Sequence, residues 1–241
     1  MRLVVVSDVH GNLAALEAVI ADVSLMSPDV VVQAGDAAVL GPRPAEVVDR
    51  LRELAWPGVI GNTDQMLRDT SVQREQLRRA PKLRSWLEVL FGVLGPWAAE
   101  RLGEERIGWL RSLALEWRLS GVRVLHASPT DLWRAPMPDA DDAELVETYG
   151  GDTGGFAIYG HIHRPFVREL GGITVGNSGS AGLPWDGDWR PSYLLLDDGK
   201  AVVRRVEYDL ERERLDLVRS GFPLADWLES VQRRARFTRP S

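Results

Sequence analysis

The sequence predicts an α/β fold whose first part is parallel and whose last part is antiparallel. Short β-branched apolar runs at residues 3–6, 30–34 and 59–60 alternate with stretches of helical spacing, and the connections are short. This β-α-β-α-β order is typical of parallel strands joined by right-handed crossovers. In the second half the strands follow one another closely, and turn dipeptides at 171–172 and 198–199 favour hairpins.

Taken in order, the expected elements begin with helices at 13–20 and 45–54 between the first strands. Between residues 65 and 117 the strand pattern vanishes and apolar residues take helical spacing, so this stretch is expected to be a helical insert or cap. A C-terminal helical segment, residues 210–241, is divided by Pro223. Further strands are expected at 122–125, 156–159, 166–170, 173–177, 193–197 and 201–208.

Composition limits the class of protein. A chain of 241 residues suits a single α/β domain with an insert, residues 1–241. Cysteine is absent, which excludes disulfides and thiolate metal sites and fits a reducing compartment. No apolar run is long enough to cross a membrane and no signal-peptide pattern opens the chain, so a cytoplasmic protein is expected. The net charge of −6 argues against broad nucleic-acid binding, which needs a basic surface.

The first strand runs directly into a polar turn that contains Asp8 and His10, and a helical pattern follows. Alternate residues leaving a strand point the same way, so a carboxylate and an imidazole converge there, as a divalent metal requires. Gly11 permits a positive φ, and Asn12 either caps the helix or faces a ligand. The alternative is an ordinary strand–turn–helix joint in which Asp8 only caps.

The positions of the remaining polar residues favour the metal. Asp36 follows the second strand and Asn62 the third. All four histidines of the chain lie directly after a predicted strand: His10, His126, His161 and His163. Together with Asp8, Asp36 and Asn62, the four histidines make seven nitrogen or oxygen ligands at one edge of a sheet. Seven ligands suit two metals that share a carboxylate, an arrangement used in phosphoryl transfer to water.

This ordered set resembles the calcineurin-like metallophosphoesterases, in particular the small phosphodiesterase-like branch found in bacteria and archaea. The similarity runs from residue 3 to residue 184 and includes the loop 177–184. It implies a four-layer αββα sandwich with two mixed sheets between helices. It also implies a first metal held by Asp8, His10, Asp36 and His163, with Asp36 bridging, and a second held by Asn62, His126 and His161.

The chemistry that the resemblance implies is hydrolysis of a small phosphoester by a hydroxide that bridges two divalent ions. Ligands without thiolate favour Mn²⁺, the first expectation here, with Fe, Zn²⁺ or Ni²⁺ as alternatives. Asn62, His126 and Asp64 are the expected catalytic residues, and Asn12 and Thr63 are expected to face the substrate. The sequence does not specify the oligomeric state or the physiological substrate.

One residue departs from the family pattern. Many members have a histidine directly after the asparagine, where it protonates the leaving oxygen, but Thr63 stands there. A hydroxyl does not titrate near neutral pH, and loss of a general acid costs roughly 10²–10⁴-fold on a poor leaving group. Asp64 has no ring to orient. We therefore expect activity on aryl phosphate esters or nucleotide-type diesters, and weak activity on phosphoserine peptides.

Two alternatives stay open. A phosphomonoesterase or protein phosphatase would use the same metals, and a non-catalytic interaction module could keep the fold without the chemistry. The complete set of ligands favours an enzyme over a module. The helical insert lies between two ligand-bearing strands, so it should wall the cleft, where Arg68 or Arg74 could meet a phosphate.

Overall fold

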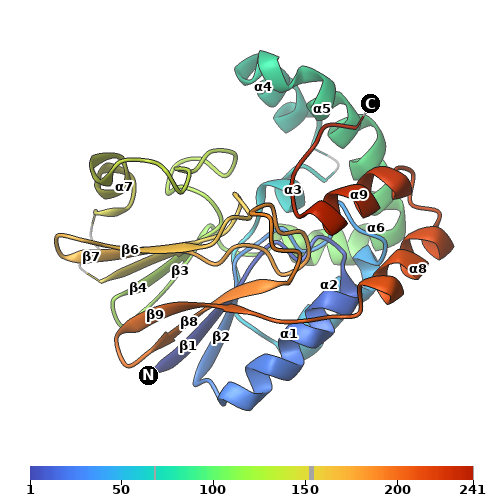
Figure 1. Cartoon of the computed structure of the whole chain (residues 1–241). Coiled ribbons are helices and arrows are strands. Elements are labelled where there is room, and N and C mark those ends of the chain that lie inside the picture. Colours follow the sequence, from blue (N-terminus) through green and yellow to red (C-terminus); the bar gives the residue numbers. More distant parts are fainter. Residues whose placement is uncertain (68, 152–154, 241) are drawn as a thin grey trace.

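Two β-sheets form the centre of the molecule in this computed structural model, which describes residues 1–67, 69–151 and 155–240 (Figure 1). The first sheet has the order β2-β1-β8-β9. Its strands are β1 (Arg2–Val6), β2 (Val30–Gln33), β8 (Ser192–Asp197) and β9 (Lys200–Arg205). β1 and β2 are parallel, as predicted, whereas β8 runs antiparallel to both β1 and β9. The chain therefore returns to its first strand near its end.

The second sheet has the order β3-β4-β5-β7-β6. β4, β5 and β7 are parallel to one another, and β3 and β6 are antiparallel edge strands. The bounds are β3 (Glu116–Leu119), β4 (Val122–Leu125), β5 (Phe156–Tyr159), β6 (Phe166–Leu170) and β7 (Ile173–Asn177). The second half is thus mixed rather than mainly antiparallel, because parallel pairs join its three central strands.

The layers follow from the alternation of side chains along β1. Leu3 and Val5 point to one face, where they pack with Val124 and Ile158 of the second sheet. Val4 and Val6 point to the opposite face and join the larger apolar cluster beneath the helices. A third cluster lies on the outer face of the second sheet. These three clusters produce the four-layer sandwich of two mixed sheets between helices that the sequence predicted.

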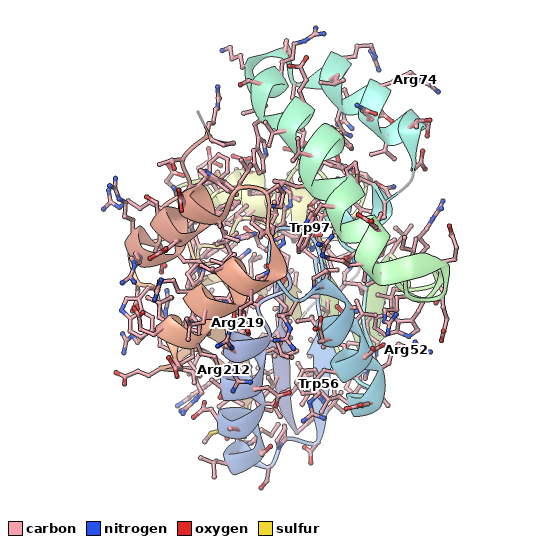
Figure 2. The ribbon with its side chains drawn as sticks, turned by 90° about the vertical axis from the view of Figure 1, so that its right-hand side faces the viewer. Arg52, Trp56, Arg74, Trp97, Arg212 and Arg219 are labelled. Atoms are coloured by element: carbon pink, nitrogen blue, oxygen red, sulfur yellow. The ribbon has the colours of Figure 1, made fainter. Side chains whose placement is uncertain are left out.

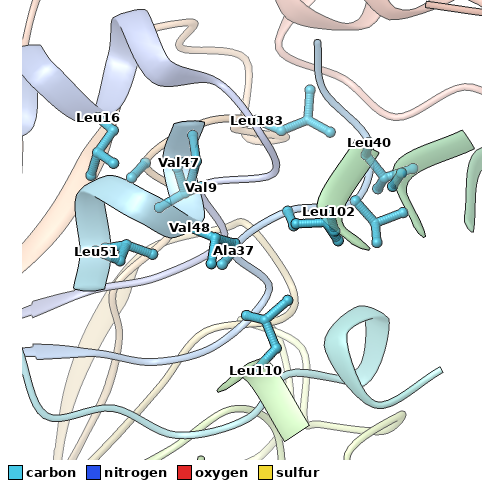
Figure 3. Close-up of a cluster of buried hydrophobic side chains, with 14 of the residues drawn as sticks. Val9, Leu16, Ala37, Leu40, Val47, Val48, Leu51, Leu102, Leu110 and Leu183 are labelled. Carbon is cyan, nitrogen blue, oxygen red and sulfur yellow. The ribbon is translucent and has the colours of Figure 1, made fainter. Parts of the chain in front are cut away.

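Helices α1 (Leu13–Met26) and α2 (Pro44–Leu54) cover the first sheet. Figure 3 shows how Leu16 of α1 and Val47, Val48 and Leu51 of α2 meet in the buried cluster. The spacing of these residues in α2 is that of one helix face. Helix α7 (Asp142–Tyr149) covers the second sheet, and its Leu145 and Tyr149 belong to the third apolar cluster.

The chain segment that connects α2 to the second sheet is largely helical, as expected, but its bounds differ from the expected 65–117. It contains α3 (Asn62–Gln65), α4 (Thr70–Arg79), a 3₁₀ turn η1 (Pro81–Leu83), α5 (Arg84–Val89), a π-helix η2 (Leu90–Leu94) and α6 (Gly95–Arg111). Trp117, expected in the helical stretch, belongs to strand β3. The expected strand at 59–60 is absent from both sheets, and Gly58 and Val59 form only isolated bridges.

Two further helices close the chain, α8 (Leu210–Ser220) and α9 (Ala225–Arg234). Figure 2 shows the helical face of the molecule, with Arg212 and Arg219 on α8 and Arg52 on α2. Among the described residues, no helix is both long and apolar enough to span a membrane.

Candidate metal centre

The carboxyl ends of the strands from both sheets meet at one place, and the predicted ligands lie in the loops that leave them. Backbone hydrogen bonds hold neighbouring loops in register, since Asp8 N–H donates to the carbonyl of Gly35 at 3.0 Å and His10 N–H to that of Asp36 at 3.0 Å. The first two ligand loops are therefore fastened to each other by their main chains, before any side chain is considered.

The backbone at this edge is strained in a systematic way. Five of the seven predicted ligands have a left-handed backbone with φ between 49° and 67°: Asp8, His10, Asp36, His161 and His163. Such conformations are uncommon for residues other than glycine, and they persist where the surrounding structure enforces them, often at functional sites. The sharp reversal after each strand turns the side chain back over the sheet edge.

The first group of ligands combines Asp8, His10 and His163, all of them buried. The Nε2 atoms of His10 and His163 lie 3.1 Å apart. His163 Nε2 is 3.3 Å from Asp8 Oδ1 and His10 Nε2 is 3.8 Å from it. Asp8 Oδ1 accepts no hydrogen bond within the described part of the chain. A buried carboxylate oxygen without a donor, facing two ring nitrogens, suits a cation between them.

The second group lies beside the first. Asp36 Oδ1 is 3.6 Å from His126 Nε2, and Asp36 Oδ2 is 3.8 Å from His10 Nε2. The Asp36 carboxylate thus faces both groups, as a bridging ligand would. Asp8 also belongs to both, because Asp8, Asp36 and His126 form a second set of close donors.

Asn62 joins the second group through its side-chain amide, which lies between two imidazoles. Its Oδ1 is 2.8 Å from His126 Nε2 and 2.9 Å from His161 Nδ1. Without a cation, the amide nitrogen would make the better hydrogen bonds at this position, whereas a cation between the three groups favours the oxygen. The donor set at this corner therefore fits a metal ion as well.

Backbone carbonyls fix the orientation of three of the histidines. The Nδ1 atoms of His10, His126 and His163 lie 2.6, 2.8 and 2.5 Å from the carbonyl oxygens of Val39, Ala34 and Leu183. A ring nitrogen against a carbonyl must be the donor, so Nδ1 carries the proton and Nε2 presents its lone pair to the site. This outer hydrogen bond is usual for metal-binding histidines.

The electrostatics of the site also fit a cation. Burial, together with the neighbouring His163, lowers the pKa of His10 to about 4. Burial, together with His126, lowers the pKa of His161 to about 4. Both rings are therefore neutral near pH 7 and free to bind a metal. Burial opposes ionisation of Asp8, but the surrounding histidines outweigh it and hold the pKa of its carboxyl well below the usual range.

Asp64 holds two ligand loops together. Its carboxylate accepts hydrogen bonds from the backbone N–H groups of Asp36 at 2.8 Å, Gly61 at 3.1 Å and Ala37 at 3.2 Å. Burial and the nearby Asp36 raise the pKa of Asp64 to about 7, against these hydrogen bonds. Gly61 is required, since a Cβ there would lie 2.0 Å from Asp36 Oδ1. The Asp64 carboxylate therefore ties together the two loops that carry Asp36 and Gly61.

The two residues expected to face the substrate, Asn12 and Thr63, are both buried. Asn12 Oδ1 accepts from Ala15 N–H at 2.9 Å, and its amide donates to the Gly182 carbonyl at 3.0 Å and to the Tyr208 hydroxyl at 3.3 Å. Asn12 therefore caps α1, which was the other interpretation of its position. The Thr63 hydroxyl is buried and has no hydrogen-bond partner among the described residues.

The two arginines expected near a phosphate give no support to that role. Arg74 is exposed in the middle of α4, on the outside of the molecule (Figure 2). Arg68 lies outside the described residues.

Three residues that sequence reasoning did not single out support the site. Ser7 Oγ donates to Asp8 Oδ2, and Ser180 Oγ donates to the Asp8 carbonyl at 2.7 Å. The indole of Trp185 stacks on the His163 ring, with centroids 3.7 Å apart and planes 13° apart. Only the loop similarity at 177–184 pointed to this region, because a stack between distant residues leaves no pattern in sequence spacing.

Comparison with known proteins defines the class to which this fold and site belong. The family model of the calcineurin-like phosphoesterase superfamily domain matches residues 1–200. The chain therefore belongs to that superfamily, whose members depend on divalent metals, and it is a hydrolase that acts on phosphoric ester bonds. Residues 201–241 lie beyond the matched part.

Individual relatives agree with this class. The chain is 30% identical to the uncharacterized protein MJ0912 of Methanocaldococcus jannaschii, over 94% of this chain and 95% of the relative. It is 27% identical to the phosphodiesterase YfcE of Escherichia coli, over 82% and 88%. Among solved structures, a metallophosphoesterase from Sphaerobacter thermophilus matches with a TM-score of 0.79 and 26% identity, covering 98% of this chain and 100% of that chain.

Proposed function

We propose that this protein hydrolyses phosphodiesters with two divalent metal ions. The observation that carries the proposal is the convergence of oxygen and nitrogen donors around the unpartnered Asp8 Oδ1. Asp8, His10, Asp36 and His163 would hold one ion, and Asp36, Asn62, His126 and His161 the other. Oxygen and imidazole ligands without thiolate favour Mn²⁺, Fe or Zn²⁺ over copper(I), and Mn²⁺ is the first candidate. Two such ions supply an activated water and neutralise charge on the phosphoryl group.

The residues of the chain have separate tasks in this proposal. The carbonyls opposite Nδ1 keep His10, His126 and His163 in the tautomer whose Nε2 faces the site. Asp64 keeps the loops of Asp36 and Asn62 at a fixed separation. His161 is only partly buried, unlike the other histidines. It therefore marks the side from which a phosphoester enters, where its ring and the Asn62 amide would contact the phosphoryl oxygens.

The preference for diesters rests on Thr63. No imidazole follows Asn62, so the leaving oxygen must depart without a proton from this position. The test combines elemental analysis of the Mn²⁺-loaded protein with rates on bis(p-nitrophenyl) phosphate and p-nitrophenyl phosphate. About two ions per chain and faster cleavage of the diester are expected. A single ion per chain would contradict the binuclear assignment, and faster cleavage of the monoester would contradict the diester preference.

A further inference from the structure

A cavity of about 290 Å³ lies between α3, α4 and the loop 128–133; we call it the α4 pocket. Its walls begin close to two proposed metal ligands. Gln65, in the wall, is the last residue of α3, which starts at Asn62, one helical turn or about 5 Å away. Ser128, also in the wall, follows His126 by two residues, or about 7 Å of chain. Two segments that line the pocket therefore also carry proposed metal ligands.

Two glutamine amides in the α4 pocket have unused hydrogen-bonding groups. Gln76 of α4 is only 6% exposed, yet its amide is not among the buried side-chain groups without a partner, so its polar atoms reach the water of the pocket. Gln65 accepts a hydrogen bond from Trp133 Nε1 at 3.1 Å through its oxygen, while its amide nitrogen has no partner among the described residues. Amide groups that face the pocket without a side-chain hydrogen bond among the described residues can exchange water for the donor and acceptor of a ligand.

The charges in the α4 pocket cancel. Arg79 pairs with Asp131 and lies 3.4 Å from Glu75, so its guanidinium is already occupied by carboxylates. A phosphate would find no free cation among the described residues of this pocket and would face two acidic groups. The occupant is therefore neutral, and the phosphoryl group stays at the metal centre.

The remaining walls contain apolar and aromatic residues beside the hydroxyl residues Ser128 and Thr130. Trp133 is held in place by stacking on Phe91, with centroids 5.7 Å apart and planes 28° apart, and by its bond to Gln65. Val72 and Leu115 complete the wall. An aromatic surface can pack against the face of a planar ring. An amide beside it offers a donor and an acceptor, which match an acceptor and a donor on the edge of such a ring.

From these observations we infer that the α4 pocket binds the base of a nucleotide phosphoester while the phosphoryl group lies at the metals. Gln76 reads the edge of the base, and Trp133 packs against its face. The inference rests on the proposed phosphodiesterase function and extends it, because it names a purine or pyrimidine base as the neutral group that sets substrate preference.

The test compares two p-nitrophenyl diesters with the same leaving group, those of adenosine 5′-phosphate and of base-free ribose 5-phosphate. Gln76→Leu should lower kcat/KM for the adenosine ester about tenfold, the typical value of one bidentate contact, and leave the base-free ester unchanged. Gln73→Leu is the matched control, because Gln73 lies on the same helix but lines a different cavity. Gln73→Leu should change neither rate.

A second measurement does not depend on activity. Adenosine alone should bind the wild-type protein saturably in calorimetry and bind Gln76→Leu about tenfold more weakly. Gln76→Glu, which keeps the size but removes the donor, should also lose affinity, and it replaces the leucine variant if that fails to fold. Equal effects of Gln76→Leu on both esters, or no adenosine binding, would overturn the inference. If adenosine binds but neither ester is cleaved, the proposed hydrolysis fails and the pocket assignment stands.

Discussion

The strand-end loops and the helices around them are built on different physical principles. The loops hold buried carboxylates and imidazoles in left-handed backbone conformations, tied to one another by main-chain hydrogen bonds. The helices α4–α6, α8 and α9 carry apolar stripes and exposed ion pairs, and α4 and α6 line cavities. Substitutions in the loops should therefore change metal binding and catalysis, whereas substitutions in the helices should change stability and substrate preference.

The largest effect should come from the loops. Asp36→Asn removes a carboxylate that faces both ligand groups, so metal binding should fall by more than about 100-fold, beyond the cost of losing an outer partner. Activity on every phosphoester should fall with it. Asp49→Asn is the control, since Asp49 pairs with Arg106 on the helical face, 2.6 Å away. Elemental analysis and rates measure both variants, and full metal content in Asp36→Asn would refute the bridging role.

Trp185 tests the boundary between the two regions. Its ring stacks on His163 and also contacts Phe237 of the C-terminal segment, with centroids 5.0 Å apart. Trp185→Ala should weaken Mn²⁺ binding about 10–100-fold, because the His163 ring loses a wall that orients it. Trp185→Phe should restore most of the affinity through an aromatic face. Calorimetric titration with Mn²⁺ measures this, and equal affinities for alanine and wild type would show that the stack is incidental.

Glu213 on α8 should affect stability alone. Burial raises its pKa to about 8, although Gln232 donates a hydrogen bond to it at 3.0 Å. In the folded state the Glu213 carboxyl therefore stays protonated at pH values between its ordinary pKa of 4.5 and about 8. The stabilisation is complete below pH 4.5 and is lost as the pH rises through about 8. Glu213→Gln should be more stable than wild type at pH 9, by about 1–3 kcal/mol, and similar to it at pH 4.5.

Denaturant unfolding at the two pH values measures the effect of Glu213→Gln. Glu211→Gln is the control, because Glu211 is an exposed residue of the same helix that pairs with Arg214 and Arg233. It should show no gain at pH 9. Metal content should not change in either variant, and a loss of metal in Glu213→Gln would break the division between helices and loops.

The smallest effect is expected at Thr63. Its hydroxyl is buried and unpartnered among the described residues, while its backbone N–H donates to Asp36 Oδ1 at 2.9 Å. Thr63→Val keeps the shape of the side chain and the backbone hydrogen bond. Rates on the two p-nitrophenyl diesters of adenosine 5′-phosphate and ribose 5-phosphate should therefore stay within about twofold. A tenfold loss would show that the hydroxyl reaches the substrate, as the sequence led us to expect.

The sequence was informative wherever chemistry follows directly from a strand end. Asp8, Asp36 and the histidines could be picked out because several separate strands each run into such a residue, which helix capping alone does not account for. The left-handed backbone at five of these residues was not predictable, because it results from contacts between loops that are distant in the chain.

Other features escaped prediction for related reasons. Asn12 fits a cap or a ligand equally well in sequence, and only the positions of Gly182 and Tyr208 decide between them. Residues 59–60 have the composition of a strand, yet they find only isolated bridge partners among the described residues. The stacking of Trp185 on His163 depends on how the loop after His163 folds back, which spacing does not reveal.

The pairing of β1 with β8 has a consequence for the order in which the molecule is made. Arg2 pairs with Asp197, so the first sheet cannot close until residues 192–197 have left the ribosome. Contacts so distant in the chain form slowly. Asp8 and His10, the first proposed ligands in the sequence, therefore lack their partner residues through most of synthesis. A divalent ion that binds only the finished centre, as proposed here, would make the stability of the completed protein depend on the supply of metal.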